Sequence, residues 1–155
     1  MVTLTVTLGV PASGKSTWAA TQPGWHACTD PSRTGLIDNR SLVESLQRET
    51  RRQLLNGGDV ITDGCNTARG LRRSWLRVGR DCGARCVLAI VECDTEEALR
   101  RNAARPLGER VTHQRMLRYL ERFPFARSEV TAEGWDEVTY PTSPPPAAYG
   151  MSRRW

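Results

Sequence analysis

The stretch of the sequence with the clearest chemistry is GVPASGKST, at residues 9–17. Its spacing, Gly9-x-x-x-x-Gly14-Lys15-Ser16, comes after a strand-like run and precedes a helix-like one, which is the context that a phosphate-binding loop requires. Glycines let the backbone turn so that its N–H groups converge on an anion, and the N-terminus of the next helix adds partial positive charge. Lys15 can reach the β- and γ-phosphates of a nucleotide, and the Ser16 hydroxyl can ligate Mg²⁺.

The alternative for this stretch is a glycine-rich turn that binds nothing. Lys15 argues against it, because it is the only lysine among 22 basic residues and a compact ammonium on a flexible stem suits a phosphate. We therefore expect ATP, or another nucleoside triphosphate, with Mg²⁺. The expected nucleotide contacts are Gly9, Pro11, Ala12, Ser13, Gly14, Lys15, Ser16 and Thr17.

Two further segments carry acids that suit transfer of a phosphoryl group to a hydroxyl. In TDPSR, Asp30 could accept the proton of an acceptor hydroxyl, and Arg33 could grip a phosphate on the acceptor. An ordinary turn remains the alternative, since Asp-Pro-Ser is good turn chemistry. Asp63 ends the apolar run VITD, where an acid can orient Mg²⁺ through water, although strands also end in Asp for turn reasons alone. Asp30 is expected to contact the metal through water as well.

The run LRRNAARPLGER suggests a lid. Arg101 and Arg105 are four residues apart, so they share one face of a helix and could close over the nucleotide phosphates. Pro106 and Gly108 come directly afterwards and suggest a hinge. The alternative is a solvated basic face.

The elements that must position these residues alternate between strand and helix. This alternation predicts a parallel sheet flanked by helices, with ligands at the carboxyl ends of the strands. Expected strands span 2–8, 25–28, 59–63, 85–92 and 135–140. Expected helices span 16–22, 40–56, 67–82 and 112–122, and a further one starts at Asp94. In the helix at 67–82, Thr67 is the expected cap, and the side chains expected to point inward are those of Leu71, Trp75, Leu76 and Val78. In the helix that starts at Asp94, Glu97 is expected to complete a capping box.

The bulk composition fits one domain. The chain has 155 residues, which we divide into a domain at 1–140 and a proline-rich tail at 141–155 that we expect to be disordered. The formal net charge of +5 suits a polyanionic substrate but could reflect genomic base composition instead. The five cysteines show no metal-binding spacing, and no secretion signal is visible, so we expect a cytoplasmic protein with reduced thiols. The longest apolar run, 86–91, is too short to span a bilayer.

Taken in order, these motifs resemble the kinase domain of phage-type 5′-OH polynucleotide kinases over roughly residues 2–140. The resemblance implies a P-loop kinase-like fold with an arginine lid, ATP and Mg²⁺ as cofactors, and a DNA or RNA end as substrate. It makes Asp30 the general base, Arg33 the clamp for the acceptor's 3′-phosphate, Asp63 the metal-orienting acid, and Arg101 and Arg105 the lid arginines.

The chain departs from that pattern where the family's Asp-x-Asn becomes Asp63-Gly-Cys-Asn66. The wider superfamily also includes kinases of hydroxymethyluracil in DNA, zeta-type toxins and small-molecule kinases, so those acceptors stay open. A nucleotide-binding switch or ATPase is disfavoured, because Asp30 and Arg33 would be idle in it.

Overall fold

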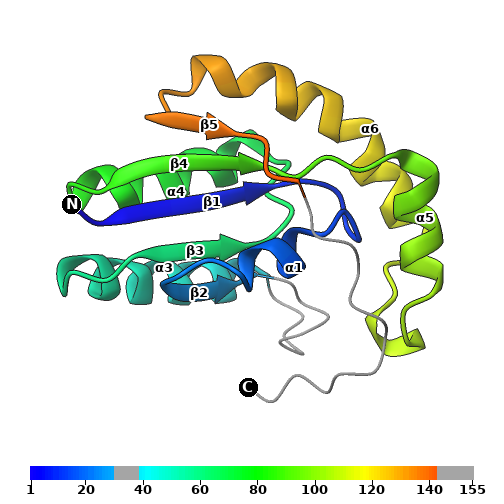
Figure 1. The fold of residues 1–155 in the computed structure, drawn as a ribbon, viewed down its shortest axis with the longest axis horizontal. Coiled ribbons are helices and arrows are strands. Elements are labelled where there is room, and N and C mark those ends of the chain that lie inside the picture. The colour runs from blue at the N-terminus through cyan, green and yellow to red at the C-terminus, as the bar shows by residue number, and fades with distance from the viewer. Residues whose placement is uncertain (30–38, 143–155) are drawn as a thin grey trace.

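The computed structural model describes residues 1–29 and 39–142 of the chain. They form a five-stranded sheet in the order β2-β3-β1-β4-β5, and every strand pair is parallel (Figure 1). The prediction of a parallel sheet flanked by helices is therefore confirmed. The elements are β1 (Thr3–Leu8), α1 (Lys15–Ala19), β2 (Trp25–Cys28), α3 (Asn39–Leu55), β3 (Val60–Asp63), α4 (Arg69–Asp81), β4 (Arg85–Ile90), α5 (Thr95–Ala103), η1 (Leu107–Glu109), α6 (His113–Glu129), η2 (Val130–Ala132) and β5 (Glu137–Thr139). The expected acceptor residues Asp30 and Arg33, and residues 143–155 of the expected tail, lie outside the described residues.

The strand order brings the expected functional loops to one edge of the sheet. Central strand β1 leads into the phosphate loop and pairs with β3 and β4, while β3 pairs in turn with β2. All the arrows in Figure 1 point the same way, so the ends of β1, β2 and β3 share the right-hand edge. At that edge Cys28 is paired with Asp63, which is the last residue of β3.

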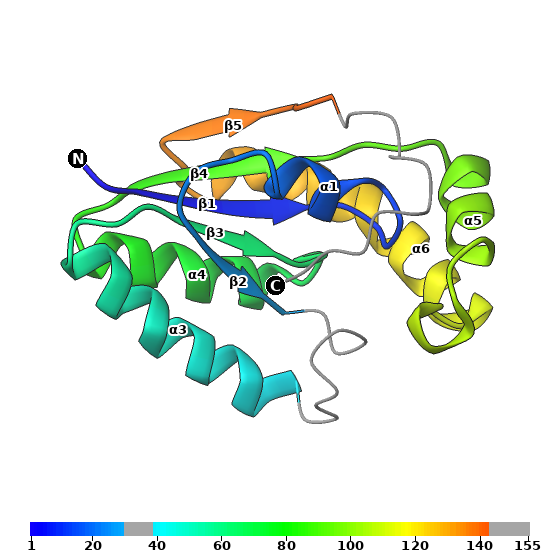
Figure 2. The ribbon, with the colours of Figure 1, turned by 60° about the horizontal axis from the view of Figure 1, so that its bottom comes forward.

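The two faces of the sheet differ in character. Leu4, Val6 and Leu8 of β1 are fully buried and belong to the core cluster that also holds residues of α3, α4 and α6. Thr3 and Thr5 alternate with them and are only partly buried. Figure 2 shows α1 on the opposite side of the sheet from α3 and α4. The Thr/Leu/Val alternation of β1 thus selects the face against which the helices pack.

The phosphate loop, α5 and α6 are joined by a second, smaller cluster of buried residues. Val10, Ala98 and Met116 form it, and Cys93 packs at its margin. Because Val10 belongs to the phosphate loop, this cluster fixes the loop against the helix expected to act as the lid.

None of the helices in the described part of the chain has the length and apolar character that a membrane span requires.

The final helix was predicted too short. We expected it to stop at Arg122, before Pro124, but α6 continues to Glu129 with Pro124 inside it. Proline removes one intrahelical hydrogen bond. Burial of Ala126 and Val130 in the main core offsets that loss and keeps the last turns helical. The Thr112 hydroxyl caps the start by accepting a hydrogen bond from the Arg115 backbone N–H.

Two predicted helix caps are wrong. Helix α4 has Ala68 as its N-cap residue, and no side chain there accepts a hydrogen bond, so Thr67 does not act as cap. At the start of α5, Asp94 occupies the N-cap position, also without a side-chain cap. Glu97 does not reach back in a capping box, because its carboxylate binds Arg100 and Arg101 one turn further along the helix.

Candidate active site

The phosphate loop has the backbone shape of an anion-binding concavity. Ala12 and Gly14 both adopt positive φ, at 64° and 102°, while helix α1 begins at Lys15 directly afterwards. The Ser13 N–H donates to the Val10 carbonyl at 3.3 Å, which closes the turn. Alternation between left-handed and ordinary conformations turns successive N–H groups toward one point, as a phosphate requires.

Gly9 starts the loop because no side chain fits there. A Cβ at this position would lie 2.6 Å from the Val91 carbonyl oxygen and 2.8 Å from the Ser13 hydroxyl. The Gly9 N–H donates to the Cys65 carbonyl at 3.1 Å. The loop is therefore held between the segment after β4 and the segment after β3.

The polar side chains of the loop face inward. Lys15 is 6% exposed, and its ammonium donates to the Val10 carbonyl at 2.6 Å. The Ser13 hydroxyl is buried and makes no hydrogen bond with a described residue. Pro11 is buried, and Ser16 and Thr17 are partly buried. A buried hydroxyl without a partner is costly, so Ser13 marks a place where a ligand oxygen or water would be stabilised.

The acid that ends β3 is tied to the segment leading to Asp30. Asp63 is 7% exposed, and its carbonyl accepts a hydrogen bond from the Thr29 N–H at 3.1 Å. A Cβ on Gly64 would lie only 2.0 Å from the Thr29 hydroxyl oxygen. The glycine after Asp63 therefore lets the end of β2 pack closely against the end of β3.

The loop after β3 is also clamped to the end of β1. The Thr7 hydroxyl oxygen lies 2.8 Å from both the Thr62 and the Gly64 carbonyl oxygens, which share its single proton. The Asn66 amide donates to the Thr7 carbonyl at 2.8 Å, and Asn66 has a positive φ of 49°. The Asn66 side-chain oxygen is buried without a partner among the described residues. Sequence reasoning left the role of Asn66 open, and the structure gives it an anchoring one.

The two expected lid arginines lie on α5 and just beyond it. Arg101 donates to Glu97 at 2.6 Å, and its side chain is 24% exposed. Hydrogen bonds from Arg100 and Arg101 lower the pKa of Glu97 to about 2. Arg105 is partly buried, and its carbonyl accepts a hydrogen bond from the Arg110 side chain at 2.5 Å.

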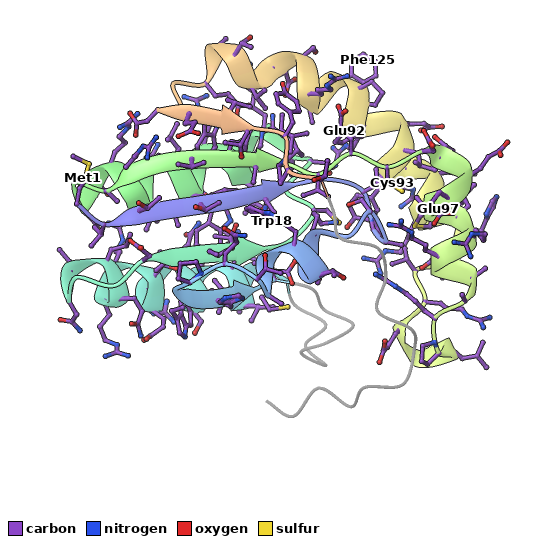
Figure 3. All side chains as sticks on the ribbon, viewed as in Figure 1. Met1, Trp18, Glu92, Cys93, Glu97 and Phe125 are labelled. Atoms are coloured by element: carbon purple, nitrogen blue, oxygen red, sulfur yellow. The ribbon has the colours of Figure 1, made fainter. Side chains whose placement is uncertain are left out.

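Cys93 packs against the small buried cluster that joins the phosphate loop to α5. Burial raises the pKa of its thiol, and the positive charges of Arg101 and Lys15 both act on it in the opposite direction. Figure 3 shows Cys93 between the end of β4 and α5. The negative charges of Glu97 and Asp94 act with burial, so the net pKa of the thiol lies above its ordinary value.

The turn after α5 is closed by a side chain that sequence reasoning missed. The Asn102 amide donates to the Val111 carbonyl at 2.7 Å, and its oxygen accepts from the Val111 N–H at 3.0 Å. This pair of bonds joins the end of α5 to the start of α6. The expected hinge, Pro106 and Gly108, lies within the segment that Asn102 brackets, so the segment has fixed ends.

Arg72 was missed as well, because α4 was expected to bury only apolar residues. Its side chain is fully buried. The guanidinium donates to the Asn66 and Thr67 carbonyls at 3.0 and 2.8 Å and to the carboxylates of Glu129 and Glu133 at 2.9 and 2.6 Å. It therefore ties the loop after β3 to the end of α6. The neighbouring Leu71, predicted to point inward, is only partly buried.

Burial raises the pKa of the Glu133 carboxyl, but hydrogen bonds from Arg72 and Trp135 outweigh it and leave the pKa below its ordinary value.

Among residues 1–29 and 39–142, no three His, Cys, Asp or Glu side chains come together as a metal site. Mg²⁺ that binds together with a nucleotide does not need such a cluster, because it is held by few protein groups and by the phosphates themselves.

Comparison with known proteins agrees with this geometry. The family model AAA_33, described as an AAA domain, matches residues 4–126, which include the phosphate loop, Asp63 and both of the arginines expected to form a lid. The chain belongs to this family. Its fold is the P-loop kinase fold, and such a fold implies nucleotide binding. No curated protein sequence matches the chain.

Several solved structures share the fold at low sequence identity. Kti12 of Chaetomium thermophilum, solved with ADP-AlF3, has a TM-score of 0.68 and 17% identity over 90% of this chain and 88% of that one. The Pnkp1/Rnl/Hen1 RNA repair complex contains a chain with a TM-score of 0.69 and 17% identity, covering 83% of this chain but only 46% of that one. A gluconokinase from Sinorhizobium meliloti 1021 has a TM-score of 0.57 and 16% identity over 93% of this chain and 84% of that one.

Proposed function

We propose that this chain is an ATP-dependent kinase that transfers the γ-phosphate to a hydroxyl at the 5′ end of a nucleic acid strand. The observation that carries the proposal is the contact between the ends of β2 and β3. The Thr29 N–H binds the Asp63 carbonyl, and Gly64 packs against the Thr29 hydroxyl. The chain therefore enters the Asp30–Arg33 motif from a point beside Asp63, at the same edge as the phosphate loop.

The phosphate loop suits the triphosphate donor. The backbone turn at Ala12 and Gly14 and the unpartnered Ser13 hydroxyl both favour an oxygen-rich anion. Lys15 donates to the Val10 carbonyl, and a phosphate oxygen would offer the same ammonium a charged acceptor in place of a neutral one. This exchange would keep the lysine charge satisfied throughout.

Mg²⁺ would be held by the Ser16 hydroxyl, with Asp63 and Asp30 acting through water. When bound, the metal would neutralise charge on the β- and γ-phosphates. The protein itself must keep Asp63 at the end of β3, and the hydrogen bonds of Thr29 and Thr7 do this. Ser16 is partly buried and follows Lys15 directly in the chain, so its hydroxyl would approach the same phosphates.

The lid arginines would act on the transferring group. Arg101 is paired with Glu97, whose side chain is 31% exposed. Ion pairs with this degree of exposure contribute little to stability, so a more highly charged phosphate can draw Arg101 away from Glu97 at little cost. Arg105 makes no ion pair with a described residue and needs no such release.

Asp30 would take the proton of the acceptor hydroxyl, and Arg33 would hold the phosphate on its 3′ side. The similarity to a chain of the Pnkp1/Rnl/Hen1 RNA repair complex supports a nucleic acid acceptor. A small-molecule acceptor is the second candidate, because the gluconokinase fold matches almost the whole of this chain. A hydroxymethylated base in DNA would need the same chemistry.

The test is transfer of labelled phosphate from ATP to four acceptors: a 5′-hydroxyl oligonucleotide, a duplex containing hydroxymethyluracil, a free nucleoside, and gluconate. Transfer to the oligonucleotide is expected. Preference for a free nucleoside or gluconate would contradict the proposal.

Arg33→Ala sharpens the test. It should lower kcat/KM by roughly 10- to 100-fold for a nucleoside 3′-phosphate but affect the bare nucleoside little, because a charge-assisted bond is worth about 1.5–3 kcal/mol. Asp30→Asn should lower transfer to both acceptors by about 10²-fold or more. Equal loss on both acceptors in Arg33→Ala would refute the phosphate-clamp role.

A further inference from the structure

Positive charge is concentrated in one part of the chain. Residues 98–128 contain eight arginines and two glutamates, so this stretch carries more net positive charge than the whole chain, whose formal net charge is +5. The stretch begins within α5, after the acidic residues Glu96 and Glu97, and ends just before Glu129, the last residue of α6; with those three glutamates included, residues 95–129 hold eight arginines and five glutamates and keep a net positive charge. The rest of the chain is close to neutral, so a uniform compositional bias toward arginine does not account for where the charge is.

Most of these arginines are free of acidic partners. Arg100 and Arg101 pair with Glu97, and Arg127 pairs with Glu92. The other five make no ion pair with any residue in the described part of the chain: Arg105, Arg110, Arg115, Arg118 and Arg122. Unpaired guanidinium groups gathered in one region raise the local potential and attract polyanions.

Three of the five form a row on α6. Arg115, Arg118 and Arg122 are spaced by three and four residues, so they lie on one face of the helix, and all three are exposed. The row is about 10 Å long at 1.5 Å per residue. A strand of B-form duplex carries one phosphate about every 3.4 Å of axis, so this length can face about three phosphates.

The row lies beside the catalytic edge. Glu129 continues the same face by seven residues and binds Arg72 near the start of α4, which comes after Asp63 and its loop. From there α6 extends past the ends of the strands to α5, and Figures 1 and 2 both show the two helices side by side. The arginine row therefore lies on the part of α6 between the contact of Glu129 with Arg72 and the helix α5.

We propose that Arg115, Arg118 and Arg122 bind the phosphates of the nucleic acid strand beyond its reacting end. This inference rests on the proposed function and adds a surface to it. A lipid surface is a poorer fit, because a membrane-binding helix needs an unpacked apolar face. The buried apolar residues Met116 and Ala126 of α6 belong to the two core clusters, and the exposed apolar side chains of this helix, Leu117 and Phe125, are eight residues apart and form no continuous apolar face.

The test compares two triple variants of equal charge. The first is Arg115→Gln with Arg118→Gln and Arg122→Gln. The matched control is Arg48→Gln with Arg73→Gln and Arg77→Gln on α3 and α4, where all three arginines are likewise exposed and without ion pairs to described residues. Circular dichroism verifies the fold of each.

Binding is measured by fluorescence anisotropy with a single-stranded 5′-hydroxyl oligonucleotide of about 16 nucleotides, at several salt concentrations. Each phosphate contact contributes about 0.7 to the slope of log K against log salt, so the α6 variant should lose about 2 from this slope. The control should keep the wild-type slope. In transfer assays, the ratio of kcat/KM for the oligonucleotide to that for a nucleoside 3′-phosphate should fall about tenfold or more in the α6 variant only.

The outcomes separate the surface from the proposed reaction. An unchanged salt slope in the α6 variant, or an equal loss of slope in both variants, would overturn the proposal that this surface binds phosphates. Wild-type binding to anionic phospholipid vesicles but not to the oligonucleotide would overturn it too. If the wild type phosphorylates only a small molecule, the proposed function fails, yet a slope change confined to the α6 variant would still establish the surface.

Discussion

Replacing Arg72 by methionine should destabilise the protein more than any other arginine substitution in α4. The Arg72 side chain is fully buried, and it binds two backbone carbonyls and two carboxylates. Its loss would leave the Glu133 carboxylate, 1% exposed, with Trp135 as its other hydrogen-bond donor. Removing one partner of a buried ion pair costs about 3–5 kcal/mol. For a chain of this size that corresponds to a fall in melting temperature of roughly 6–20 °C.

The measurement is urea unfolding followed by circular dichroism, with thermal melts beside it. Arg73→Met is the matched control, since Arg73 is exposed in the same helix. It should stay within about 0.5 kcal/mol of wild type. Adding Glu133→Gln to Arg72→Met should recover about 0.5–3 kcal/mol, because the amide leaves no unpaired buried charge. A loss below about 1 kcal/mol for Arg72→Met would refute the reasoning, because it would mean that the buried network contributes no more than a surface pair.

The same network predicts a dependence on pH. Burial raises the pKa of Glu133, but the bonds from Arg72 and Trp135 lower it by more, so the net pKa is below the ordinary 4.5. A carboxyl with a lowered folded-state pKa stabilises the fold fully above its unfolded pKa and loses that contribution as the pH falls through the folded one. Stability should therefore fall below about pH 4.5, and Glu133→Gln should flatten that part of the profile in urea unfolding measured across pH.

The remaining predictions concern the site. Lys15→Ala should lower phosphoryl transfer by about 10²-fold or more with the fold intact by circular dichroism, and near wild-type turnover would contradict the phosphate-loop role. Arg101→Ala should lower kcat more than it raises the KM for ATP, whereas a change in KM alone would indicate ground-state binding. Gly64→Ala should reduce both stability and transfer, since its Cβ would lie 2.0 Å from the Thr29 hydroxyl, while Gly70→Ala, with open space around it, should do neither in melts and transfer assays.

Much of the fold could be predicted because its signals are local. The alternation in β1 and the apolar run in β4 each identify a strand, and the glycine and lysine spacing after β1 identifies a phosphate-binding loop. The predicted strands and most helices agree with the structure within a few residues. The end of α6 could not be predicted, since Pro124 is a local stop signal and the burial of Ala126 that overrides it is tertiary.

The buried polar network was beyond sequence reasoning for a related reason. Arg72 and Arg73 are adjacent and identical in type, so only the packing of α4 decides which is buried. The partners of Arg72, Glu129 and Glu133, lie roughly sixty residues away in sequence. Neither carries a local mark of burial. Asn102 was missed in the same way, because its partner, Val111, is recognisable only once α5 and α6 are placed.

Asn66 shows how a departure from a motif can be absorbed structurally. The phage-type kinases that the sequence resembles have one residue between Asp and Asn, and this chain has two. The extra length is taken up at Asn66 itself, one of two non-glycine residues with positive φ among those described, and Asn tolerates that conformation better than most. Its amide is then committed to the Thr7 carbonyl at the base of the phosphate loop. Because Gly9 binds the neighbouring Cys65 carbonyl and Arg72 binds the Asn66 carbonyl, the longer loop is held from three sides. Asp63 thereby keeps its place at the end of β3, although the Asn beyond it serves as an anchor.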